Sequence, residues 1–72
     1  MKKVKKIEIY VNGKKTLING ELKLSKLIKD FKVPLKKVAI EINQRIINKK
    51  RINIINLKKN DKVEIVHFIG GG

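Results

Sequence analysis

The first apolar residues of the chain alternate with polar ones, as in a half-buried β-strand. Over residues 5–11, Ile7, Ile9 and Val11 fall on one face, and the residues between them fall on the other. This period of two matches the side-chain alternation of an extended strand that packs one face on a core. We therefore predict a strand at residues 5–11.

Two turn signals follow this strand. Asn12 and Gly13 both tolerate a positive φ, so the pair favours a tight hairpin. The Thr-Leu-Ile run at residues 16–18 is then expected to pair back on the first strand. A second turn is predicted at the Asn-Gly pair of residues 19–20.

The pattern then changes to the period of a helix. Leu24, Leu27, Ile28 and Phe31 lie at i, i+3, i+4 and i+7, which places them on one stripe of a short helix able to cover a sheet face. Pro34 predicts that the helix ends soon after Phe31. Its start has no clear cap residue, because the serine in this stretch lies inside the apolar stripe.

Alternation returns in the second half of the chain. Val38, Ile40 and Ile42 predict another strand. A turn at residues 43–44, Asn-Gln, then leads to the apolar pair at residues 46–47, which is expected to form a brief neighbouring strand.

Residues 48–56 match neither period. Ile52, Ile54 and Ile55 must pack somewhere, but the lysines and asparagines around them favour an irregular crossing over the sheet edge. Residues 57–61 indicate a turn, in which Asn60 suits a left-handed backbone position.

The last apolar segment, Val63 to Phe68, is apolar on both faces. This pattern favours a central strand in a mixed sheet over an edge strand that faces solvent. The order of strand, hairpin strand, helix, strand, short strand and final strand predicts an α+β domain. We expect a mixed sheet of four to five strands on one main helix, formed by residues 1–68.

The composition removes several classes of chemistry. The 72 residues allow one modest core, and a chain of this size rarely holds an enclosed pocket as well. There is no cysteine, which excludes disulfides, thiolate nucleophiles and the usual structural zinc sites, and one histidine cannot make a metal site alone. The basic N-terminus alternates and does not form a signal peptide or membrane span. We expect a cytoplasmic protein that is monomeric by itself and binds neither a metal nor a membrane.

The end of the chain is its most unusual feature. Gly70, Gly71 and Gly72 cannot cap a helix or usefully extend a packed strand. A segment without side chains is thin enough for a narrow channel in another protein to admit it up to the terminal carboxylate. We expect residues 69–72 to form a mobile tail. The alternative is a frayed end or a cloning remnant, but the glycines directly follow an apolar strand without a spacer.

Three segments of the sequence resemble a known family. The final strand and tail, VEIVHFIGGG at residues 63–72, look like the terminal strand and tail of the ThiS-type sulfur carriers of thiamin biosynthesis. VAIEIN at residues 38–43 resembles the middle strand of that family. Residues 57–63 match its Leu-x-x-Gly-Asp-x-Val element, with Asn60 in place of glycine. The chain departs from the family pattern at Gln44, where glycine is common, and at residues 49–52, which lack the usual aromatic.

The resemblance implies a fold and a mechanism. The family has the ubiquitin-like β-grasp fold, and its members are carriers and not enzymes. A ThiF-like enzyme uses ATP to adenylate the terminal glycine, which is Gly72 here, so the carrier itself would bind no cofactor. A cysteine desulfurase route supplies sulfur that converts the adenylate to a thiocarboxylate, and a ThiG-like thiazole synthase receives it. Gly71 and Gly70 would provide reach, and Ile69 and Phe68 would help to dock the root of the tail.

Three other interpretations were weighed against this one. His67 lies beside the tail, but no Ser, Cys or paired carboxylate accompanies it, so packing or partner contact is favoured over catalysis. A related carrier for molybdopterin, cysteine, tRNA thiolation or ubiquitin-like conjugation would use the same activated glycine. A net charge of +13 also permits a nucleic-acid-binding module. One Tyr, two Phe and no Trp supply a base-stacking surface poorly, however, so solvated lysine-rich loops are favoured.

Overall fold

The computed structural model describes residues 5–68. In chain order its main elements are β1 (Lys6–Val11), β2 (Lys14–Asn19), α1 (Leu24–Asp30), β3 (Val38–Ile42), β4 (Arg45–Ile46) and β5 (Lys62–His67). Two short 3₁₀ turns, η1 (Leu35–Lys37) and η2 (Lys49–Arg51), lie before β3 and after β4. Within residues 5–68, none of the helices has the length and apolar character needed to cross a membrane.

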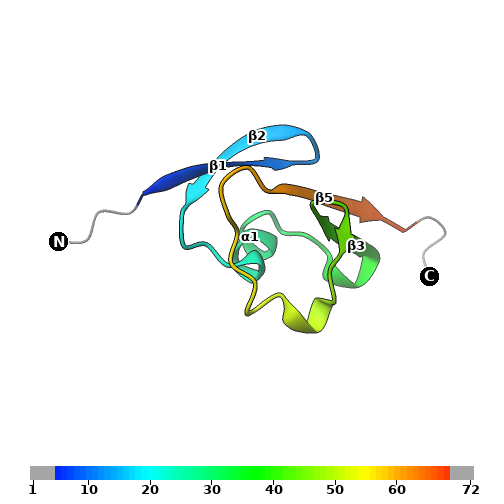
Figure 1. Cartoon of the computed structure of the whole chain (residues 1–72). Helices are drawn as coiled ribbons and strands as arrows, with labels where there is room; N and C mark the ends of the chain where they lie inside the picture. The colour runs from blue at the N-terminus through cyan, green and yellow to red at the C-terminus, as the bar shows by residue number, and fades with distance from the viewer. Residues whose placement is uncertain (1–4, 69–72) are drawn as a thin grey trace.

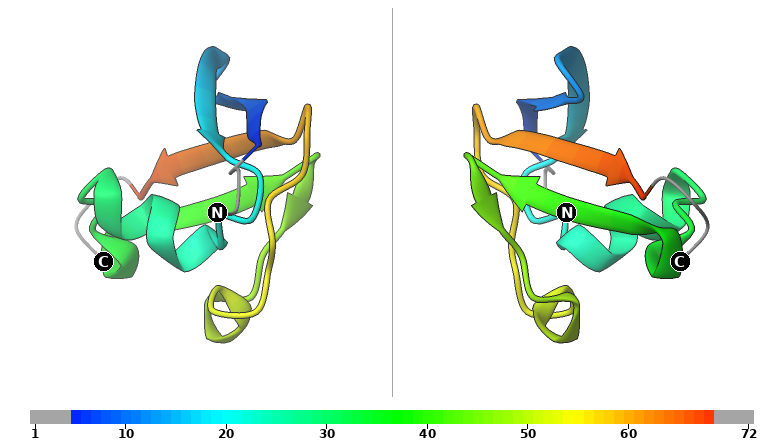
Figure 2. Two further views of the ribbon diagram at one scale, coloured as in Figure 1. Left: turned by 90° about the vertical axis from the view of Figure 1, so that its left-hand side faces the viewer. Right: turned by 90° about the vertical axis from the view of Figure 1, so that its right-hand side faces the viewer.

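The strands form one mixed sheet in the order β2-β1-β5-β3-β4. β1 and β5 run parallel, and the other neighbouring strands run antiparallel. α1 lies against one face of this sheet (Figures 1 and 2). The β1–β2 hairpin forms one edge of the sheet, and the β3–β4 hairpin forms the other. The predicted α+β fold, with a mixed sheet on one main helix and β5 at its centre, is confirmed.

The core lies between the sheet and α1. The two faces of the strands differ as the alternation predicts, because the residues that face α1 are apolar. The buried residues are Ile9, Val11, Ile18, Leu24, Leu27, Ile28, Val38, Ile40, Ile42, Leu57 and Val63. Each fully buried aliphatic side chain of this kind contributes about 1.5–3 kcal/mol relative to exposure to water.

Both predicted hairpin turns are present. Asn12 has φ 49° and Gly13 has φ 81°, and the turn between β3 and β4 has φ 52° at Asn43 and 71° at Gln44. Positive φ at both central residues is the geometry that matches the twist of a two-residue hairpin. Because the turn between β3 and β4 contains only residues 43–44, the short strand begins at Arg45. The apolar pair at residues 46–47 had predicted a start at Ile46.

The helix ends earlier than its apolar stripe predicted. Its last residue is Asp30, and Lys32 follows with φ 54°. The Val33 amide donates to the Ile28 carbonyl at 3.0 Å, which is the long hydrogen bond of a Schellman ending. Because the chain turns away at this point, Phe31 leaves the stripe and its side chain is 46% exposed. Pro34 follows this ending and does not cause it.

The start of the helix explains why no cap residue could be found in the sequence. The amide of Leu24 donates to the carbonyl of Ile55 at 2.9 Å, and the amide of Ser25 donates to the carbonyl of Ile52 at 3.0 Å. The irregular segment at residues 48–56 therefore satisfies the free amides of the first turn in place of a side chain.

This segment also corrects one packing prediction. Ile52 and Ile55 are partly buried against the core, but Ile54 is 61% exposed. Its amide donates to the carbonyl of Arg51 at 3.0 Å, within a turn that directs the side chain outward. The following turn is as predicted, because Asn60 has φ 70°.

Candidate functional site

The C-terminal end of β5 is the root from which the predicted tail leaves the fold. The strand spans Lys62–His67, one residue earlier at each end than predicted. Its register against β3 runs from Ile42↔Val63 to Val38↔His67. Beyond the strand, the Phe68 amide donates to the Lys37 carbonyl at 2.9 Å. The ladder with β3 therefore holds the backbone as far as Phe68.

The other side of β5 is held differently. The register with β1 covers Tyr10↔Lys62 and Val11↔Val63. Next to these pairs, the side-chain Oδ1 of Asn12 accepts a hydrogen bond from the Ile65 amide at 2.7 Å. Within the described part of the chain, the last residues of β5 are thus flanked by one strand only, which leaves room beside the root of the tail.

Phe68 is the aromatic residue at this root. The Nζ of Lys49 lies 5.3 Å from the centroid of its ring, which is within the range of a cation–π contact. The side chain is nevertheless 53% exposed. Phe68 is therefore positioned by its amide and by Lys49, while much of its ring faces outward.

The outer face of the sheet, the face away from α1, is open next to Phe68. Val66 lies on this face opposite Ala39 and is 49% exposed. The prediction of a central position for this strand is confirmed, and α1 covers only one of its two faces (Figure 2). Glu64 and Glu41 also lie directly opposite each other on the outer face.

His67 is the one histidine of the chain, and it lies at the end of β5. It is exposed, opposite Val38 in β3. Within residues 5–68, no three His, Cys, Asp or Glu side chains are grouped so that they could hold a metal ion. These observations favour partner contact over acid–base chemistry for this histidine.

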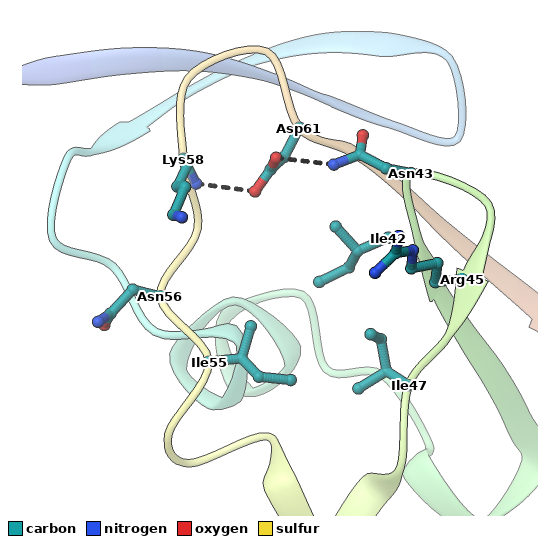
Figure 3. A pocket seen from close by; sticks show the side chains of 8 residues that line it. All are labelled: Ile42, Asn43, Arg45, Ile47, Ile55, Asn56, Lys58 and Asp61. Carbon is teal, nitrogen blue, oxygen red and sulfur yellow. Dashed lines mark hydrogen bonds between the residues drawn. The ribbon is translucent and has the colours of Figure 1, made fainter.

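A groove of about 520 Å³ lies at the opposite end of β5, between the β3–β4 turn and the segment before β5 (Figure 3). Ile42, Ile47 and Ile55 form its apolar side. Its carboxylate, Asp61, accepts hydrogen bonds from the Lys58 amide at 2.8 Å and from the Asn43 Nδ2 at 3.0 Å. Because both oxygens of Asp61 serve to close this turn, the groove has a structural carboxylate and not a free one.

The structure therefore places one predicted site residue, Phe68, and adds three neighbours that the sequence did not indicate. These are Lys37, Asn12 and Lys49, which contact the root of the tail. Asn12 was predicted only as a turn residue, since nothing in the sequence signals a contact with a residue so distant along the chain. The other predicted site residues, Ile69, Gly70, Gly71 and Gly72, lie outside the described residues.

Comparison with known proteins places this architecture in a family. The model of the ThiS family matches residues 4–72. The chain belongs to the ThiS family. The crystal structure of the thiamine biosynthesis protein ThiS from Geobacter metallireducens superposes with a TM-score of 0.81 at 28% identity, covering 92% of this chain and 100% of that one. The β-grasp fold implied by the resemblance is confirmed.

Two curated relatives match this chain, and they differ greatly in length. The chain is 41% identical over 46 residues to the sulfur carrier protein ThiS of Bacillus subtilis, covering 64% of this chain and 70% of that protein. It is 30% identical over 66 residues to a thiazole synthase of Magnetococcus marinus. That match covers 92% of this chain but only 20% of the synthase. The match over residues 4–72 confirms the family that the sequence resembles.

Proposed function

We propose that the protein carries sulfur as a thiocarboxylate on Gly72 and delivers it for the formation of the thiamin thiazole ring. The observation that carries this proposal is the match of the whole described fold, together with the glycine-ending segment, to the ThiS family. The central strand β5 supports it, because this strand ends at His67, with only two residues between it and the glycines.

The chemistry requires activation of the Gly72 carboxylate, since a carboxylate is a poor electrophile. One of its oxygens attacks the α-phosphate of ATP in a ThiF-like partner, which forms an acyl-adenylate and releases pyrophosphate. A cysteine desulfurase route delivers the sulfur as a persulfide, and a thiol reductant releases it as hydrosulfide while a disulfide forms between the carrier thiol and the reductant. The hydrosulfide sulfur then attacks the acyl carbon. The C–S bond forms, the C–O bond to AMP breaks and the thiol proton goes to solvent.

The fold acts as a handle for this terminus and contributes no acid or base. Gly70 and Gly71 extend the chain into the partner, where a side chain would obstruct a narrow channel. Ile69 and Phe68 dock the root of the tail, and the half-exposed ring of Phe68 supports this role. The carrier itself requires no bound cofactor, because ATP belongs to the partner.

A ThiG-like thiazole synthase is the proposed acceptor of the sulfur. The Magnetococcus marinus relative supports this assignment, because the segment that matches this chain is part of a protein that is itself a thiazole synthase. A carrier and an acceptor that occur in one polypeptide are held close together, which raises their effective concentration.

The proposal is tested by intact-protein mass spectrometry after incubation with a ThiF-like enzyme, ATP and a sulfide source. The native chain is expected to gain the mass difference between sulfur and oxygen, and deletion of Gly72 is expected to abolish the gain. Phe68→Ala should slow the modification without changing the reactive residue. Ile54→Ala removes a similarly exposed apolar side chain away from β5 and serves as the control. Sulfur uptake by the Gly72-deleted chain would refute the site.

A further inference from the structure

The sheet has a free edge at β2, one strand removed from β5. β2 is the first strand in the sheet order, with β1 as its neighbour on one side. β1 separates it from β5, so this edge is not part of the root of the tail (Figure 1). An edge strand presents backbone amides and carbonyls that another extended chain can bind.

The register identifies which backbone groups these are. Val11↔Lys14 closes the two-residue turn, and the Gly20 amide donates to the Lys5 carbonyl at 2.7 Å, farther along the same ladder. In an antiparallel ladder, hydrogen-bonded pairs alternate with pairs whose groups point away. The amides and carbonyls of Lys15 and Leu17 therefore point outward from the sheet.

Side chains beside the β2 backbone could contact a strand that is added at this edge. A groove of about 230 Å³ follows the edge, between β2 and α1. Thr16 and Ile18 line it from the strand, and Phe31 lines it from the end of the helix. Leu17 is 67% exposed on the outer face, and Phe31 is 46% exposed. Apolar side chains of an added strand would find contacts with Phe31 on the face that carries α1.

The positive charge at the β2 edge indicates which kind of strand could bind there. Lys14 and Lys15 are exposed at the start of β2. The nearby Asp30 carboxylate is already paired with the Lys26 Nζ at 3.0 Å. A second copy of this chain is disfavoured, because two molecules of net charge +13 repel each other and edge lysines oppose self-pairing. The charge instead favours a strand that carries carboxylates.

We propose that the β2 edge binds an extended acidic segment of a partner protein by strand addition. The segment would pair with the backbone of Lys15 and Leu17, place apolar side chains against Phe31 on the face that carries α1, and place carboxylates near Lys15 on the outer face. This surface acts independently of the Gly72 carboxylate, so a partner can hold the body of the protein while the tail is engaged elsewhere.

The test uses the full chain, labelled with ¹⁵N, and a synthetic peptide in which valine and glutamate alternate, blocked at both ends. Amide hydrogen exchange at Lys15 and Leu17 should slow at least about tenfold in the complex, because these amides gain backbone partners. Exchange at Thr16 and Ile18, whose amides already face β1, should change little. A peptide of the same composition with its glutamates in one block tests for charge alone.

Two charge-reversed pairs of residues distinguish peptide binding at the β2 edge from nonspecific electrostatic attraction. Lys14→Glu with Lys15→Glu should weaken binding about tenfold, since it reverses the local charge. Lys50→Glu with Arg51→Glu makes the same change in net charge in η2, which follows β4 at the opposite edge of the sheet, and should weaken binding no more than about threefold. Phe31→Ala should weaken binding about fivefold without unfolding the chain, because the ring is half-exposed. Deletion of Gly72 should leave the affinity unchanged.

Several results would overturn the proposal. They are equal losses in the two charge-reversed pairs, equal binding of the block peptide, and complex formation without slower exchange at Lys15 and Leu17. A single-stranded RNA oligonucleotide belongs in the same titration. If RNA bound this edge more tightly than the peptide, the surface would be assigned to nucleic acid instead.

Discussion

Asn12 shows how one residue serves two parts of the fold. Its φ of 49° fits the first position of the hairpin turn, and its Oδ1 accepts the Ile65 amide at 2.7 Å. Asparagine combines tolerance of the left-handed region with a side-chain acceptor. It therefore continues the support of β5 just where the pairing with β1 ends, close to the root of the tail.

Replacing Asn12 by alanine is predicted to destabilise the protein by about 1–2 kcal/mol, because alanine loses the acceptor and is strained at positive φ. Urea unfolding measures this loss, and hydrogen exchange at the Ile65 amide should become faster. Asn12→Asp keeps both properties and should stay within about 0.5 kcal/mol of the native chain. If the aspartate and alanine variants were equally destabilised, the hydrogen bond to Ile65 would not be the cause.

At the scale of elements, the sequence predicted the strands and turns better than the helix ends. Alternation fixes which face of a strand is buried, and the residue pairs at 12–13 and 43–44 have the backbone freedom that their turns require. The helix ended early because a lysine, Lys32, adopts φ 54°, which its residue type does not signal. The helix start was hidden because backbone carbonyls of residues 52 and 55 cap it, and such long-range contacts leave no local pattern.

The sequence also predicted only part of the candidate site. The central position of β5 follows from the pattern of the last apolar segment, whereas Phe68 was singled out only through the family resemblance. The contacts of Phe68 with Lys37 and Lys49 depend on how β3 and η2 pack, so the sequence could not indicate them. The open outer face at Val66 was missed because a central strand need not be covered on both faces.

The pairing of Glu41 with Glu64 gives a prediction at this scale. Like charges directly opposite each other on neighbouring strands are destabilising. Glu41→Lys should therefore raise the free energy of unfolding by about 0.5 kcal/mol, as measured by the urea midpoint. Glu8→Lys makes the same change in net charge, but Glu8 lies opposite Leu17, so it controls for global repulsion and should give no gain. A lower midpoint for Glu41→Lys than for the native chain would contradict the account.

At the scale of the whole molecule, the dominant property is the net charge of +13. Among the described residues only one salt bridge, Lys26–Asp30, satisfies the ion-pair distance, so most lysines face solvent. Such a field attracts acidic partners and polyanions over distances of about 10 Å at moderate salt. Its presence alone does not create a nucleic-acid site, because the described surface carries few aromatic residues on which bases could stack.

Binding to single-stranded RNA is therefore predicted to be weak and governed by salt, with a Kd of about 1 µM or weaker at physiological ionic strength. Fluorescence anisotropy over a salt series measures it, and deletion of the three glycines serves as a control that should leave it unchanged. Tight, sequence-dependent binding that persists at high salt would favour a nucleic-acid function over the carrier function.

We propose the terminal carboxylate of Gly72 as the reactive group of the protein. The most direct measurement compares the native chain with a semisynthetic chain whose C-terminus is an amide, each incubated with the adenylating enzyme, ATP and sulfide, and analysed by tandem mass spectrometry. The account predicts that the native chain acquires one sulfur, located by fragmentation at Gly72, and that the amide acquires none. Sulfur located on any other residue, or acquired by the amidated chain, would contradict it.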